Sequence, residues 1–256
     1  MKELASLLLA LAVIYLSFGA YLYLFQRKLI YYPTAADPSF RAAEITFEND
    51  GYRLHGWVLN PGKKRALIYF GGNSEPVSDR SAFFLELFAD YSVYLVNYRG
   101  YGRSEGSPSE AALFSDALAI YDHVAARHDG VSVYGRSLGS GVAVYLAVER
   151  PLDWLILLTP YDSIAEVAQG IYPWFPVRHL VRDRFDSAAR AGAIDIPVFI
   201  ASAEHDRVIA PRHTVALRDA LVRAEIEYVQ IAGAAHNDIT GFAQYREAIA
   251  RFVSAH

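Results

Sequence analysis

Residues 131–148 read VSVYGRSLGSGVAVYLAV, and this stretch decides the fold. Val131–Tyr134 is a short apolar run that predicts a buried strand, and Leu138–Val148 predicts a helix that ends before Pro151. Between them, Gly135-Arg136-Ser137-Leu138-Gly139 matches the pattern G-x-S-x-G. Small residues on both sides allow a tight turn that lifts a serine hydroxyl clear of a sheet, at a helix N-terminus. Ser137 is therefore a candidate nucleophile, although the pattern alone also fits an ordinary glycine-rich turn.

Strand-like and helix-like stretches alternate on both sides of this segment. Residues 44–48 and 53–59 predict a hairpin across Asn49-Asp50-Gly51. Short, almost uninterrupted apolar runs then predict buried strands at 66–70, 93–97, 131–134, 154–159, 198–202 and 227–231. Helical spacing predicts helices at 78–89, 110–128, 138–148, 211–223 and 244–253. The alternation predicts an α/β fold with a mostly parallel central sheet and helices on both faces.

A base for Ser137 is expected among the eight histidines, because a serine hydroxyl is a poor nucleophile without one. His236 follows the predicted strand 227–231 in a loop of small residues, Ala232-Gly233-Ala234-Ala235, that lets an imidazole approach. Ligands of a parallel sheet bind at the carboxyl ends of its strands, where this loop is expected to lie. Other histidines, His55 among them, are predicted on surface elements. His236 is therefore the candidate base.

An acid that orients the base is expected at another strand end. Asp206 follows the predicted strand 198–202, where its carboxylate is expected to accept the Nδ1 proton of His236 and fix the tautomer. Asp162 and Glu204 are its rivals. Asp206 is preferred because hydrolases with this serine turn use the chain order found here, Ser137, Asp206, His236.

Two backbone N–H groups are expected to bind the oxyanion of a tetrahedral intermediate. One is that of Leu138, immediately after the candidate nucleophile. The other is assigned to Asn73, in the loop Gly71-Gly72-Asn73-Ser74 that follows the predicted strand 66–70. Glycines let that backbone turn inward. Taken alone, the loop is also an ordinary glycine turn.

The N-terminal segment differs from the rest of the chain. Leu4–Phe25 contains no charged residue, and as a helix it is roughly 33 Å long, enough to cross a hydrocarbon core of about 30 Å. Arg27 and Lys28 follow it, as expected at a membrane interface. We predict an uncleaved single-pass anchor over residues 1–28 and a hydrolase domain over 29–256. A signal peptide is the alternative, and the side of the membrane that the domain faces stays open.

Composition excludes several classes of site. The formal net charge is −4, and no basic tract is longer than Lys63-Lys64-Arg65, so no nucleic-acid surface is expected. The chain has no cysteine, which excludes disulfides, thiolate metal sites and a cysteine nucleophile. The chemistry expected of Ser137 needs no metal or organic cofactor. Composition leaves the oligomeric state open.

The most specific piece of sequence is Asn97-Tyr98-Arg99-Gly100-Tyr101-Gly102-Arg103-Ser104-Glu105-Gly106. The chain resembles the Bem46-like branch of α/β hydrolases. The resemblance is carried by this loop, by the segment Phe25–Pro33 and by the serine turn. This membrane-anchored group is related to the mammalian α/β-hydrolase domain-containing proteins 12, 13 and 17. The resemblance spans nearly the whole chain and implies an α/β-hydrolase fold after one transmembrane helix. Many relatives have His-Gly-Asn where this chain has Gly71-Gly72-Asn73; the backbone donor survives that change, whereas the histidine side chain is lost.

The resemblance implies a serine esterase or thioesterase that cleaves small-molecule or lipid-like acyl substrates through an acyl-enzyme on Ser137. A peptidase or an acyltransferase shares this chemistry, and a catalytically silent binding module shares the fold. Residues 161–193 interrupt the alternation and predict a small lid or insert. Its aromatic cluster, Ile171–Pro176, is expected either to line an acyl pocket, to touch the bilayer or to form the core of a helical cap. Arg99 and Arg103 are interpreted as ties between the long loop and its neighbours.

Overall fold

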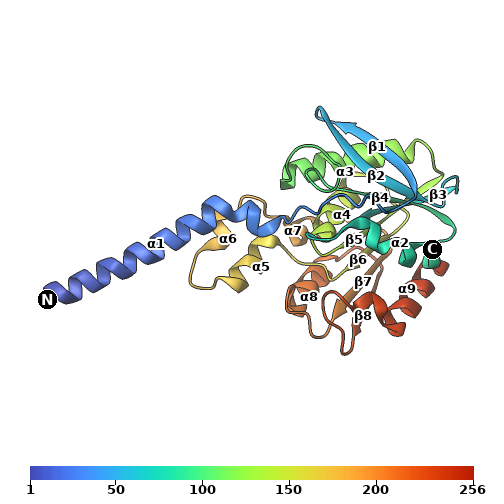
Figure 1. The fold of residues 1–256 in the computed structure, drawn as a ribbon. Helices are drawn as coiled ribbons and strands as arrows, with labels where there is room; N and C mark the ends of the chain where they lie inside the picture. The colour runs from blue at the N-terminus through green and yellow to red at the C-terminus, as the bar shows by residue number, and fades with distance from the viewer.

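An eight-stranded sheet forms the centre of the computed structural model, which describes all residues from Met1 to His256 (Figure 1). Its strand order is β1-β2-β4-β3-β5-β6-β7-β8. The strands are β1 (Ala43–Asn49), β2 (Tyr52–Leu59), β3 (Arg65–Phe70), β4 (Tyr91–Val96), β5 (Gly130–Arg136), β6 (Leu155–Leu158), β7 (Val198–Ala203) and β8 (Ile226–Ile231). Only β2 with its neighbours β1 and β4 pairs antiparallel. The predicted, mostly parallel sheet is confirmed.

The β1–β2 hairpin turns within the three residues predicted for it, at Asp50 and Gly51. Asn49 pairs with Tyr52, and between them Asp50 and Gly51 have φ of 50° and 76°. Positive φ at both central residues is the geometry of a two-residue hairpin turn, for which Asp-Gly is among the preferred pairs. The hairpin prediction is confirmed.

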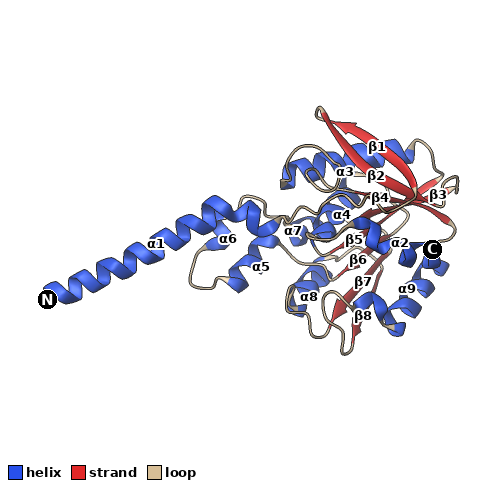
Figure 2. Cartoon of the chain, viewed as in Figure 1, coloured by secondary structure: helices blue, strands red, loops and turns tan.

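Helices cover both faces of the sheet (Figure 2). On one face lie α2 (Ser81–Leu87) and α9 (Ala243–Ala255), whose aromatic side chains join a buried cluster of 25 residues. On the other face lie α3 (Glu110–Ala125), α4 (Leu138–Glu149), α7 (Ser187–Ala191) and α8 (Pro211–Ala220), around a buried cluster of 37 residues. Two short 3₁₀ turns, η1 (Val77–Arg80) and η2 (Ile239–Gly241), complete the loops. Alternate residues of a strand contact opposite clusters, which explains the continuous apolar runs in the sequence.

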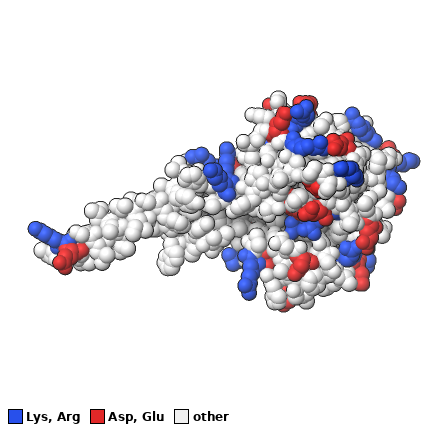
Figure 3. Space-filling view, viewed as in Figure 1, with Lys and Arg blue, Asp and Glu red and all other residues white.

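Helix α1 (Lys2–Ile30) projects from the domain as a stalk (Figure 1). It is long and apolar enough to cross a membrane, and most of its length is not covered by the rest of the protein. In the space-filling view, the charged side chains on the stalk are confined to its far end and its base (Figure 3). The predicted long N-terminal apolar helix is confirmed.

The segment between β6 and β7 contains α5 (Ile164–Ile171), α6 (Val177–Leu180) and then α7. Helices α5 and α6 lie beside the domain end of α1, whereas α7 packs on α4 and α8 (Figure 1). The Ser163 side chain caps α5 by accepting a hydrogen bond from the N–H of Glu166 at 3.0 Å. The part of the insert that leaves the sheet is therefore α5, α6 and the loop between them.

The loop 97–106 folds back over β2, and the prediction that places His55 on the surface is wrong. His55 is buried rather than on the surface, because this loop covers it and Ser104 Oγ accepts a hydrogen bond from its backbone N–H at 2.9 Å. Arg99 binds Asp116 at 2.7 Å and Asp50 at 2.6 Å, and Arg103 binds Glu44 at 2.5 Å. These ion pairs confirm the interpretation of both arginines as ties between the loop and its neighbours.

Candidate active site

The predicted strand, turn and helix around Ser137 are present, and the turn is strained. Strand β5 ends at Arg136 and α4 begins at Leu138, which leaves Ser137 between them with a φ of 50° and a ψ of −119°. A residue other than glycine rarely adopts a positive φ, and such strain is found where a nucleophile must stand out of a turn. The Ser137 N–H donates to the carbonyl of Leu158 at 2.9 Å, and Ser140 Oγ donates to the Ser137 carbonyl at 2.7 Å. These bonds hold the strained turn in place.

The two glycines of the turn are required by close packing. A Cβ on Gly139 would lie 2.0 Å from the carbonyl oxygen of Phe70, and one on Gly135 would lie 2.6 Å from Cβ of Ala143. Neither neighbour can move away without displacing β3 or α4. The glycines of G-x-S-x-G therefore let α4 lie directly against the sheet behind the serine.

Ser137, His236 and Asp206 come together although they are far apart in the sequence. Nε2 of His236 lies 3.0 Å from Oγ of Ser137, and Nδ1 lies 2.7 Å from Oδ2 of Asp206. A carboxylate can only accept, so Nδ1 carries the ring proton and Nε2 is left to accept the serine proton. All three residues are buried. The geometry suits transfer of a proton from the hydroxyl to the imidazole during nucleophilic attack.

The second carboxylate oxygen of Asp206, Oδ1, is also hydrogen-bonded. Oδ1 accepts hydrogen bonds from the backbone N–H groups of Val208 and Ile209, each at 2.8 Å. These two bonds fix the plane of the carboxylate and direct Oδ2 at His236. The turn that follows β7 therefore positions the acid as well as supplying it.

The two rival acids are engaged elsewhere. Oδ1 of Asp162 lies 2.9 Å from Nδ1 of His213, on α8, and accepts from the N–H of Ser163. Glu204 is exposed and accepts from the N–H of Gly233 at 2.8 Å. Neither carboxylate contacts His236. Among the three candidates, the structure places only Asp206 behind the imidazole.

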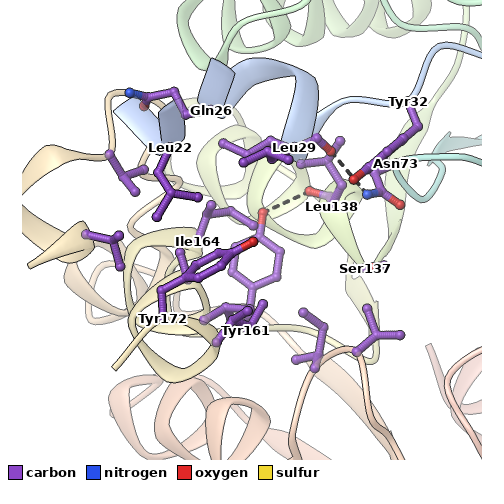
Figure 4. A pocket seen from close by; sticks show the side chains of 18 residues that line it. Leu22, Gln26, Leu29, Tyr32, Asn73, Ser137, Leu138, Tyr161, Ile164 and Tyr172 are labelled. Carbon is purple, nitrogen blue, oxygen red and sulfur yellow. Dashed lines mark hydrogen bonds between the residues drawn. The ribbon is translucent and has the colours of Figure 1, made fainter. Parts of the chain in front are cut away.

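The two predicted oxyanion donors line one cavity together with Ser137 (Figure 4). Leu138 is the first residue of α4, so its N–H precedes the hydrogen-bonded turns of the helix and has no partner within it. The N–H of Asn73 has no protein acceptor, whereas that of Gly72 donates to Glu75 at 2.9 Å. The Asn73 carbonyl accepts from Oη of Tyr101 at 2.7 Å, which fixes the loop. Both N–H groups are thus free to bind an oxyanion.

A charge cluster formed by the buried Glu75 and Arg136 and the half-buried Arg80 was missed by the sequence analysis. Oε2 of Glu75 accepts from Nη1 of Arg136 at 2.7 Å and from the N–H of Gly72, while Oε1 pairs with Arg80. The other amino group of Arg136 donates to Oδ1 of Asn237 at 2.8 Å, next to His236. The cluster therefore connects the oxyanion loop, the serine turn and the histidine loop. The available signal was a charged residue directly before Ser137, in a segment that is otherwise uncharged.

Glu75 is held ionised inside the protein. Burial opposes ionisation, but the guanidinium groups of Arg136 and Arg80 and the N–H of Gly72 hold the pKa of this carboxyl below its usual range. Because the pKa of Glu75 is lower in the folded state than in the unfolded state, its ionisation stabilises the fold. The full contribution is present at pH values above the pKa of the unfolded state, about 4.3. That contribution is lost as the pH falls from there through the lowered pKa of the folded state.

Glu75→Gln is expected to lower the free energy of unfolding at pH 7 by about 3–5 kcal/mol, because it leaves the buried Arg136 and the half-buried Arg80 without their carboxylate. Urea unfolding of the full chain in detergent measures this difference, which should shrink when the pH is taken below about 4. Glu149→Gln removes an exposed carboxylate that makes no ion pair and is the control. Equal stability of the two variants at pH 7 would contradict this role of Glu75.

The cavity in front of Ser137 has a volume of about 290 Å³ and is mainly apolar. Of its 18 lining residues, 15 are hydrophobic, and the other three, Gln26, Asn73 and Ser137, are uncharged. One wall comes from α1 through Leu22, Leu29 and Ile30, and the facing wall comes from α5. Figure 4 shows side chains of both walls pointing into the same space. The N-terminal helix is therefore part of the candidate active site, which the sequence analysis did not anticipate.

Comparisons with known proteins agree with this fold. The family described as serine aminopeptidase, S33, matches residues 63–182. An uncharacterised protein of Mycobacterium tuberculosis is 36% identical over 231 residues, which cover 83% of this chain and 81% of that protein. Human α/β hydrolase domain-containing protein 17B is 30% identical over 203 residues, which cover 76% of this chain and 68% of that protein.

Solved structures with much lower identity share the architecture. The esterase Pf2001 of Pyrococcus furiosus matches with a TM-score of 0.70 over 88% of this chain and 99% of that chain, at 16% identity. Est1E of Butyrivibrio proteoclasticus, solved with ferulic acid, matches with a TM-score of 0.67 over 82% of this chain and 98% of that chain, at 18% identity. These likenesses confirm the predicted fold, and the sequence relatives confirm the predicted family. The chain belongs to the Bem46-like family of α/β hydrolases, together with α/β hydrolase domain-containing protein 17B.

Proposed function

We propose that the protein is a serine hydrolase that cleaves the carboxylic ester or thioester bond of acyl-type substrates, and that α1 anchors it in a membrane. The observation that carries this proposal is the hydrogen-bonded series from Ser137 through His236 to Asp206, at the end of an apolar cavity. Family membership and the esterases among the structural neighbours support the reaction class.

The reaction proceeds in two halves. Oγ of Ser137 attacks the acyl carbonyl while Nε2 of His236 takes the hydroxyl proton, and the N–H groups of Leu138 and Asn73 bind the oxyanion that forms. The imidazolium then protonates the departing alcohol or thiol, which leaves the acyl group on Ser137. In the second half, His236 takes a proton from water as the water oxygen attacks the acyl-enzyme. The imidazolium then returns that proton to Oγ of Ser137, the bond between Oγ and the acyl carbon breaks, and the carboxylic acid is released. Asp206 stabilises the imidazolium in both halves.

The lining of the cavity favours an acyl chain over a peptide. An aminopeptidase must bind the charged α-amino group of its substrate, and burying such a charge without a carboxylate partner is strongly unfavourable. No charged side chain lines this cavity. A peptidase, which the name of the matched family suggests, is therefore the second candidate. An acyltransferase would use the same acyl-enzyme with a different acceptor in place of water.

Hydrolysis of acetyl, butyryl, octanoyl and dodecanoyl esters of one chromogenic alcohol tests the proposal. Ala168 lies on the α5 wall, and Ala168→Phe is expected to lower kcat/KM for the dodecanoyl ester at least ~10-fold, because burying two fewer methylenes costs about 1.6 kcal/mol. The acetyl ester should be nearly unaffected. Ala189→Phe, on an exposed position of α7, is the control. Equal losses for short and long esters would contradict an acyl chain in this cavity, and no turnover of any ester would favour a silent binding module.

A further inference from the structure

The loop between α5 and α6 runs far along α1, well beyond the base of the stalk. Oη of Tyr15 donates a hydrogen bond to the carbonyl of Trp174 at 2.8 Å, and the Tyr15 ring stacks on Phe175 with 4.4 Å between centroids. Phe18 also contacts Phe175, at 5.3 Å between centroids. Trp174 is therefore held beside the middle of the apolar helix rather than beside its charged end.

Polar contacts near the base fix how α1 and the insert lie against each other. The side chain of Gln26 accepts from the N–H of Arg182 at 2.7 Å and donates to the carbonyl of Leu180. Arg27 binds the buried carboxylate of Asp183 at 2.9 Å. Together with the Tyr15 contact, these bonds extend over three turns of α1. These contacts therefore hold the loop at one position along α1.

The depth of this loop follows from the geometry of α1. The apolar segment ends at Phe25 on the side of the domain, and Tyr15 lies ten residues deeper along α1. At a rise of 1.5 Å per residue, Tyr15 is about 15 Å from that end of the segment. A hydrocarbon core is about 30 Å thick. The loop that contacts Tyr15 therefore reaches about the middle of the bilayer when α1 spans it.

The outer surface of the insert has the composition that this depth requires. Trp174 is 84% exposed and Ile171 is 60% exposed. Exposed cations lie nearer the base, at the level of lipid headgroups: Arg27, Lys28, Arg178 and Arg182. Figure 3 shows that the stalk carries no charged side chain between its far end and the cations at its base. Apolar and aromatic groups beyond a belt of cations match the layering of a lipid leaflet.

We propose that the tip of the insert, Ile171–Pro176, is a second membrane-inserted element, which enters the hydrocarbon of the leaflet nearest the hydrolase domain alongside α1. The cavity before Ser137 lies between these two elements, so its mouth then faces lipid, and an acyl chain enters it sideways from the leaflet. This inference rests on the proposed anchoring by α1. It assigns the lipid leaflet, rather than water, as the route of the substrate.

Fluorescence of Trp174 tests the depth directly, because the other two tryptophans, Trp57 and Trp154, are buried in the sheet domain at 4% and 0% exposure. The full-length protein is placed in phosphatidylcholine vesicles whose acyl chains carry bromine at known depths. We expect bromines in the acyl chains to quench the wild type, those near mid-chain most strongly, and Trp174→Phe to lose this quenching. Aqueous iodide should have little effect on either protein.

A second probe separates this inference from the anchoring itself. Leu11→Trp in the Trp174→Phe background places a tryptophan on α1, where quenching by acyl-chain bromines reports insertion of the helix. If this probe is quenched by bromine while Trp174 is quenched by iodide instead, the inserted loop is overturned and the anchor stands. If neither probe is quenched by bromine, the anchoring fails and the inference fails with it. Ester hydrolysis, measured separately, reports on the catalytic proposal alone.

Discussion

His236→Ala is expected to lower kcat for ester hydrolysis by about 10⁴- to 10⁶-fold. Nε2 of His236 is the base within reach of the Ser137 hydroxyl, at 3.0 Å, and without it the hydroxyl keeps its proton. Part of the rate enhancement should remain, because the oxyanion donors and the cavity are unchanged. Steady-state turnover of a short soluble ester, with circular dichroism to verify folding, measures the effect.

The chain offers a matched control for this variant. His213 is buried and bonded to a carboxylate, Asp162, as His236 is bonded to Asp206, but it contacts no candidate nucleophile. His213→Ala should therefore keep turnover close to that of the wild type wherever the variant is folded. Loss of turnover in His213→Ala with retention in His236→Ala would show that the wrong histidine has been assigned.

Asp206→Asn is expected to lower kcat by about 10⁴-fold with little change in the fold. Two backbone N–H groups point at Oδ1, so the amide oxygen of asparagine must occupy that position. Its NH₂ group then faces Nδ1 of His236 and donates to it. The imidazole proton is forced onto Nε2, which can no longer accept from Ser137. The loss comes from the wrong tautomer, and it appears in kcat measured with saturating ester.

Two isosteric changes control for a general effect of removing a carboxylate. Asp162→Asn and Glu204→Gln alter the two rival acids, neither of which contacts His236. Both variants should hydrolyse ester at close to the wild-type rate. A full rate in Asp206→Asn, or a large loss in Asp162→Asn, would contradict the assignment of the acid.

Local patterns in the sequence predicted the sheet and the ends of its strands. Asp50-Gly51 determines its turn through two positive φ values, and the strand, glycine turn and helix around Ser137 are contiguous in the chain. Because the carboxyl ends of parallel strands meet at one edge, placing Asp206 and His236 after their strands was enough to bring them to Ser137. These features depend on residues close in sequence or on a general rule of sheet topology.

The features that the sequence analysis missed depend on contacts between distant residues. Gln26 and Arg182 are 156 positions apart, and Glu75 and Arg136 are 61 positions apart. A lone glutamate or arginine in a sequence is usually solvated, so neither Glu75 nor Arg136 shows that it is buried. In the same way, the periodicity of α1 shows that it is apolar but not that Leu22 and Ile30 form a wall of the cavity. His55 was misplaced because the covering loop lies some 45 residues further along the chain.

The central claim is that the Ser137 hydroxyl is an activated nucleophile, and labelling with a fluorophosphonate tests it most directly. The full-length protein in detergent is treated with the probe and digested, and the modified peptide is located by mass spectrometry. The geometry predicts one adduct, on Ser137, which is absent from Ser137→Ala and forms far more slowly in His236→Ala. No adduct on the folded wild type, or equal labelling of the wild type and Ser137→Ala, would contradict it.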